Sequence, residues 1–199
     1  MMVPHYLEPY VKASRRHGGG FKSLLWSSPR TQRARFGALA RAVKFDGSHL
    51  IDAGCGRADF LEYLLENGVR PGSYVGLEAV EALADAAEAR GRPLARIVRG
   101  DFIRQPSLLQ GPADFILFSG SLNTLSDDEF EATLSAAWAA AGTAIVFNFL
   151  SSPLLAGNRH LNWHAPADVA RLAVQFSRNW QMFEDYLEGD CTMRIRKGL

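Results

Sequence analysis

Short apolar runs alternate with helix-periodic segments along most of the chain. Between the runs, apolar residues recur at the i, i+3 and i+4 spacing of an amphipathic helix, as at Phe60, Leu61, Leu64 and Leu65. Alternating strands and helices predict a parallel sheet with helices on both faces. We therefore expect an α/β fold with a doubly wound, mostly parallel sheet. The predicted strands are residues 50–53, 73–78, 95–99, 113–118 and 143–149.

Both ends of the chain depart from this alternation. Residues 180–186 and 192–196 predict an antiparallel hairpin that finishes the sheet, in which we expect Asp185 and Tyr186 to be structural. Residues 1–28 show no sustained period and predict a lid or clasp. Ser28 and Pro29 then fit the N-cap and first turn of an added helix. We expect an N-terminal lid and helix over residues 1–45 and the main domain over residues 46–199.

A glycine turn follows the first predicted strand, at Asp52-Ala53-Gly54-Cys55-Gly56. Two glycines remove the Cβ atoms that would keep a ligand away from the backbone, and the next helix offers unpaired N–H groups. A dinucleotide fingerprint needs a third glycine at position 59, where this chain has Asp59. The turn therefore favours a small ligand other than a nicotinamide dinucleotide.

This turn resembles the glycine-rich motif of class I S-adenosylmethionine-dependent methyltransferases. Ala58 stands where that family often has a third glycine. The resemblance covers most of the chain and implies a single Rossmann-like domain with S-adenosyl-L-methionine as the cofactor. It also implies that Asp52, Ala53, Gly54, Cys55 and Gly56 contact that cofactor.

Three later stretches match the family's other cofactor contacts. Glu78-Ala79 ends a strand beside the glycine turn, where the acid can accept hydrogen bonds from ribose hydroxyls. Gly100-Asp101-Phe102 resembles the adenine site, and Ser119 and Asn123 follow the strand that leads to the acceptor. The stretch after that strand lacks the Asn-Pro-Pro-Tyr and Pro-Cys motifs of DNA methyltransferases, which disfavours methylation of DNA bases.

The N-terminal segment carries a weaker resemblance. His17-Gly18, Trp26-Ser27 and Gln32 to Phe36 resemble the same segment in small bacterial methyltransferases of undefined substrate. This implies that the segment closes over the cofactor, with Trp26, Gln32 or Arg35 near the methionine carboxylate. The alternative is that Trp26 and Phe36 belong to the core.

The loop at residues 151–164 is our candidate for substrate contact, because it concentrates hydrogen-bonding and stacking side chains. These are Arg159, His160, Asn162, Trp163 and His164. An oxygen acceptor would benefit from a general base, and His17, His160 or His164 could serve, whereas an amine acceptor needs none. His160 and His164 are four residues apart, but a third metal ligand is not evident, so we expect no metal site.

Charge and composition limit the remaining possibilities. Residues 1–49 hold nine Lys or Arg residues against Glu8 and Asp46, so this segment carries +7 in a chain of 199 residues whose net charge is +1. Either a solvated basic helix covers an acidic body, or the segment grips an anionic substrate. No secretory signal, membrane-spanning run or disulfide framework is evident, and we expect a cytoplasmic protein.

Together these patterns predict a methyltransferase that moves a methyl group from S-adenosylmethionine to a small-molecule acceptor by direct in-line transfer. One alternative is an RNA methyltransferase that uses the basic N-terminal segment. Another is a non-catalytic protein that binds S-adenosylmethionine or a related nucleoside. The sequence leaves the acceptor open, and with it the choice of O, N, C or S as the methylated atom.

Overall fold

The computed structural model describes residues 2–153 and 160–198. Its strands form one sheet in the order β3-β2-β1-β4-β5-β7-β6. All pairs from β3 to β5 are parallel, and β7 is antiparallel to both of its neighbours. The predicted α/β sheet with a terminal hairpin is therefore confirmed. The strands are β1 (His49–Ala53), β2 (Ser73–Glu78), β3 (Ala95–Arg99), β4 (Phe115–Phe118), β5 (Ala144–Leu150), β6 (Trp180–Phe183) and β7 (Asp190–Arg196).

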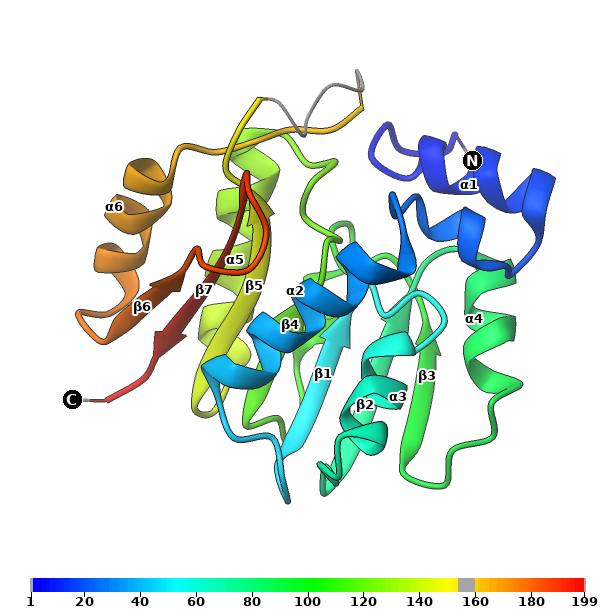
Figure 1. Cartoon of the computed structure of the whole chain (residues 1–199), viewed down its shortest axis with the longest axis horizontal. Coiled ribbons are helices and arrows are strands. Elements are labelled where there is room, and N and C mark those ends of the chain that lie inside the picture. Colours follow the sequence, from blue (N-terminus) through cyan, green and yellow to red (C-terminus); the bar gives the residue numbers. More distant parts are fainter. Residues whose placement is uncertain (1, 154–159, 199) are drawn as a thin grey trace.

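Helices cover both faces of the sheet (Figure 1). On one face, α2, α3 and α4 pack over strand residues such as Leu50 and Val146, and on the other face α5 and α6 pack over Ile51 and Ile145. Neighbouring strand residues thus enter opposite cores, as the two-residue period of a strand requires. The helices are α1 (Glu8–His17), α2 (Pro29–Ala42), α3 (Asp59–Glu66), α4 (Glu81–Glu88), α5 (Asp127–Ala140) and α6 (Pro166–Phe176), with short 3-10 turns η1 (Phe21–Leu24) and η2 (Pro106–Leu109).

Two helices begin at residues whose side chains cap them, and the sequence predicts the first of these caps at Ser28. The Ser28 hydroxyl accepts a hydrogen bond from the Thr31 N–H at 3.1 Å, and Pro29 opens α2. At the start of α5, Ser126 and Glu129 form a capping box, in which each side chain accepts a hydrogen bond from the backbone N–H of the other residue. Each cap satisfies backbone donors that the first helical turn leaves unpaired.

The N-terminal segment is more regular than its sequence suggests. Residues 8–17 form α1, in which no residue is fully buried. The segment is fixed by close packing: a Cβ on Gly19 would lie 2.5 Å from the Ala82 carbonyl oxygen of α4. The Ser23 hydroxyl also donates to the Gly18 carbonyl at 2.7 Å.

Helix α2 shares its core with the sheet. Phe36, Leu39 and Phe45 belong to the same apolar cluster as Leu50 and Phe60. The division into an N-terminal lid and helix over residues 1–45 and a main domain over residues 46–199 therefore stays a prediction, and the two parts share one core. None of the described helices is long and apolar enough to cross a membrane.

Candidate functional site

The glycine turn lies at the carboxyl end of β1 and is closely covered by other segments. Gly54 has a φ of +80°, and a Cβ there would lie 2.4 Å from Cβ of Ser121. Gly56 has a φ of +57°, and its Cβ would lie 2.6 Å from Cδ2 of Leu24. Glycine adopts these backbone angles without strain, and at Gly54 the close approach of Ser121 requires it as well.

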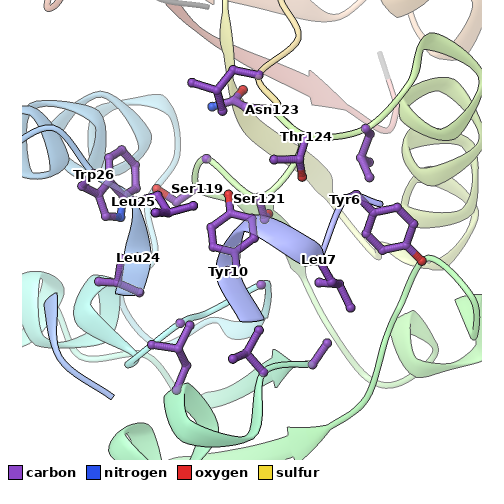
Figure 2. A pocket seen from close by; sticks show the side chains of 18 of the residues that line it. Tyr6, Leu7, Tyr10, Leu24, Leu25, Trp26, Ser119, Ser121, Asn123 and Thr124 are labelled. Atoms are coloured by element: carbon purple, nitrogen blue, oxygen red, sulfur yellow. The ribbon is translucent and has the colours of Figure 1, made fainter. Parts of the chain in front are cut away.

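A cavity of about 300 Å³ lies between the carboxyl ends of the strands and the N-terminal segment. This volume falls at the lower end of the range for small-molecule sites. Figure 2 shows Leu24, Leu25 and Trp26 on one side of the cavity, Tyr6 on the other side and Tyr10 between them. The sheet side contributes Gly54, Gly56, Glu78, Ala79, Asp101, Phe102 and Ser119, and the remaining wall includes Asn123, Leu125, Leu150, Leu161 and Leu187.

Glu78 is fixed at the end of β2. Its Oε2 accepts the Gly56 N–H at 2.8 Å and its Oε1 accepts the Val80 N–H at 2.8 Å. Burial raises the pKa of Glu78 to about 7, although the backbone donors favour the ionised form. The carboxylate therefore lies against the glycine turn, as its position in the sequence predicts for a doubly wound sheet.

Asp101 links the end of β3 to the N-terminal segment. Its Oδ1 accepts the N–H groups of Ile103 and Arg104, at 3.0 and 3.3 Å. Its Oδ2 accepts a hydrogen bond from the Tyr6 hydroxyl at 2.8 Å, and burial together with this contact raises the pKa of Tyr6. Tyr6 therefore attaches the residues before α1 directly to the cavity wall.

Asp52 does not line this cavity. Asp52 instead lines a smaller hollow that shares Gly54 and Gly56 with the cavity, and Gln32, Cys55 and Asp59 also line this hollow. Oδ2 of Asp52 accepts the Tyr74 hydroxyl at 2.5 Å, whereas its buried Oδ1 has no hydrogen-bond partner among the described residues. Burial outweighs the effect of Tyr74 and raises the pKa of Asp52 to about 7. The three acids thus open onto two adjoining hollows rather than one.

Trp26 and Arg35 form the inner wall on the N-terminal side. The guanidinium carbon of Arg35 lies 4.8 Å from the centroid of the Trp26 ring, a cation–π distance. Arg35 is also paired with the buried carboxylate of Asp190. Phe36 belongs to the core, 5.3 Å from Phe60 between ring centroids, whereas Trp26 lines the cavity. Ala53 lies behind the wall, where its carbonyl accepts the Ser121 hydroxyl at 2.6 Å.

The three candidate histidines lie apart from the cavity. His17 and His160 are exposed, and His164 stacks on Phe130 with ring centroids 4.0 Å apart. Burial lowers the pKa of His164, and its Nδ1 lies 3.5 Å from Asp127. None of the three is among the described residues that line the cavity, so a role as general base stays a prediction without geometric support.

The candidate substrate loop contributes Leu161 to the cavity wall. Asn162 instead donates to the Leu125 carbonyl at 2.6 Å, and Trp163 is exposed. Arg159 lies outside the described residues. Among those that are described, no group of three or more His, Cys, Asp or Glu side chains could hold a metal ion.

Several cavity residues carry no signal that sequence reasoning could use. Tyr6, Leu7, Tyr10 and Leu24 come from a segment without apolar period, and only the fold brings them over the glycine turn. Tyr10 is half-buried near Glu78, and its removal from water together with that carboxylate raises its pKa to about 12.

The sequence profile of the methyltransferase domain family matches residues 28–182. The chain belongs to this family, and its activity class is that of a methyltransferase. No curated protein sequence matches the chain.

Solved structures that share the fold are distant in sequence. Magnesium protoporphyrin IX methyltransferase from Synechocystis PCC 6803, with bound SAH, is 16% identical with a TM-score of 0.65, and the match covers 84% of this chain and 82% of that one. The DhpI–SAH complex is 15% identical with a TM-score of 0.71, covering 96% and 94%. The small RNA methyltransferase HEN1 is 13% identical with a TM-score of 0.65, covering 87% of this chain and 26% of that one.

Proposed function

We propose that this protein transfers a methyl group from S-adenosyl-L-methionine to a small-molecule acceptor by direct in-line transfer. The proposal is carried by one observation: a single cavity joins the glycine turn, two carboxylates at successive strand ends and a mostly apolar wall beyond Ser119. The glycine turn and the two carboxylates suit a nucleoside that carries hydrogen-bond donors. The mostly apolar wall suits a small acceptor.

The residues present fit the cofactor. S-adenosylmethionine carries hydrogen-bond donors on its ribose, its adenine amine and its ammonium group, and acids are the acceptors that these donors need. We assign Glu78 to the ribose and Asp101 with Phe102 to the adenine. Asp52 takes the ammonium group, because its buried Oδ1 has no hydrogen-bond partner among the described residues. Arg35 and Trp26 take the methionine carboxylate, while Ala53, Gly54, Cys55, Gly56, Ala79 and Ser119 shape the walls.

The cofactor supplies a methyl group that is already activated by a positive sulfur. The chain's own contribution is then to orient the acceptor, which can lower a barrier by roughly 7–11 kcal/mol for well-placed reactants. The N-terminal segment excludes water, because Tyr6, Leu7, Tyr10 and Leu24 cover the cavity. We propose that residues 1–28 act as a lid that the Tyr6–Asp101 hydrogen bond holds closed.

Calorimetry with S-adenosylhomocysteine tests the cofactor assignment. We expect Glu78→Gln and Asp101→Ala each to weaken binding by roughly ten- to a hundredfold, since a hydrogen bond to a charged group contributes about 1.5–3 kcal/mol. Asp114→Asn is the matched control, because Asp114 accepts the His49 N–H at the opposite edge of the sheet. Wild-type affinity in both cavity variants would refute the assignment.

An RNA acceptor is the second candidate. It is favoured by the fold similarity to the small RNA methyltransferase HEN1 and by the basic excess of residues 1–49. A small acceptor has the stronger support, because the N-terminal segment already covers the cavity and leaves a modest volume.

A further inference from the structure

A buried polar cluster connects the C-terminal hairpin to the cavity wall. Asp190 opens β7, is 1% exposed and pairs with Arg35 through Nε, at 2.5 Å, and Nη2. Both contacts fall on Oδ2 of Asp190, and its Oδ1 accepts the hydroxyl of Tyr186. We call Arg35, Asp190 and Tyr186 the arginine clamp. Within the described residues, Asp190 is the one hydrogen-bond acceptor of Arg35.

The clamp continues through the core to a second point on the same cavity. The Tyr186 hydroxyl accepts a hydrogen bond from Thr192 at 2.9 Å, and Thr192 accepts one from the Asn148 amide at 2.6 Å. The Ser119 hydroxyl, on the cavity wall, donates to Oδ1 of Asn148 at 3.3 Å. Asn148 and Thr192 are fully buried. The polar chain thus begins and ends at the cavity.

Stability alone does not account for this arrangement. Burying an ion pair removes two charges from water, and well-packed apolar residues often replace such a pair without loss. The clamp does, however, fix a long side chain: Arg35 is held between the Asp190 carboxylate and the Trp26 ring. A guanidinium has five N–H donors, so the contacts of Nε and Nη2 with Asp190 leave further donors on Arg35, a residue that lines the cavity.

We propose that Asp190, steadied by Tyr186, is a positioning residue that holds Arg35 ready for the carboxylate of the cofactor's methionine end. This inference rests on the proposed function. It also concerns residues outside the stretch that the family profile matches, since that stretch ends at residue 182. The hairpin therefore takes part in ligand binding as well as finishing the sheet.

The test compares two ligands by calorimetry: S-adenosylhomocysteine, and 5′-methylthioadenosine, which lacks the amino-acid end. We expect Asp190→Asn to weaken S-adenosylhomocysteine roughly three- to tenfold, the size expected when one long side chain must be ordered on binding. Affinity for 5′-methylthioadenosine should stay unchanged. In an Arg35→Gln background, Asp190→Asn should add no further loss, because Asp190 acts through Arg35.

Two further variants complete the design. Tyr186→Phe keeps the ion pair and should give a smaller loss in the same direction, and it decides the outcome if Asp190→Asn does not fold. Asp185→Asn is the control, because Asp185 is exposed and pairs with Arg41 on the surface. Equal losses for both ligands, or unchanged or tighter S-adenosylhomocysteine binding, would overturn the inference. A wild-type chain that binds neither ligand would overturn the proposed function, and this inference with it.

Discussion

Asp52 and Glu78 are carboxyl groups that the fold has removed from water. The N–H groups of Gly56 and Val80 donate hydrogen bonds to Glu78 and offset part of the cost of burying it. The hydroxyl of Tyr74 does the same for Asp52. In both cases burial outweighs the hydrogen bonds, and the pKa rises to about 7. Such groups gain most from a ligand that offers further donors, which is the physical reason for placing the cofactor's polar groups beside them.

The raised pKa of Asp52 predicts a pH-dependent stability. The folded chain keeps the proton up to about pH 7, whereas the unfolded chain loses it near the ordinary value of 3.8. The stabilisation from this proton is therefore complete below pH 3.8, the pKa in the unfolded chain. It is lost as the pH rises through about 7, the pKa in the folded chain. We expect up to about 1.4 kcal/mol of loss for each pH unit crossed.

Urea unfolding at about pH 5 and about pH 8 measures this effect. Asp52→Asn cannot ionise, so its free energy of unfolding should fall less between the two pH values than that of the wild type. Asp185→Asn, at an exposed site, should follow the wild type. Parallel curves for the wild type and Asp52→Asn would contradict the interpretation.

Helix α2 joins the core to the cavity. Phe36 contacts Phe60 of α3 on one side, and on the other side its ring centroid lies 6.3 Å from that of Trp26, which lines the cavity. The same helix carries Arg35 into the arginine clamp. Packing of α2 therefore sets the position of two cavity residues that its sequence period does not mark.

Removing the Phe36 ring should show how firmly α2 is held. We expect Phe36→Ala to lower the free energy of unfolding by about 3–5 kcal/mol, because it leaves a cavity among aromatic rings. Val174→Ala on the exposed face of α6 is the control and should change it by less than about 0.5 kcal/mol. Urea unfolding of both variants gives the comparison, and a loss below about 1 kcal/mol for Phe36→Ala would mean that α2 packs loosely.

At the scale of the whole molecule, part of the basic N-terminal charge is neutralised by the sheet domain. Arg33 pairs with Glu66, Arg41 with Asp185 and Arg35 with Asp190. The two exposed pairs contribute little free energy, but they use cations that a nucleic acid would need. This arrangement supports a basic segment lying over an acidic body.

We therefore expect no gel shift with bulk RNA, even at low salt, where phosphate contacts are strongest. A shift that weakens steeply with added salt would instead favour the RNA acceptor. In that event an Arg15→Gln, Arg16→Gln double variant would locate the contact, because both side chains are exposed at the end of α1.

The sequence by itself determined what depends on near neighbours in the chain. Short apolar runs predict the strands, and apolar residues at i, i+3 and i+4 predict most of the helices. Ser28 and Ser126 mark helix starts, and Gly54 and Gly56 mark the turn. These features follow from backbone geometry and local hydrogen bonds, so they can be read within a few residues. Helix α1 is the exception, because residues 1–28 show no sustained apolar period and none of its residues is fully buried.

Only the tertiary structure decided which side chains meet at the site. Tyr6 and Asp101 are 95 positions apart, and Arg35 and Asp190 are 155 apart, so no local pattern connects them. The histidines show the converse, since imidazoles that looked suitable in the sequence lie outside the cavity. Local periodicity fixes how a segment folds, whereas its neighbours depend on how all the segments pack together, and the cavity is a product of that packing.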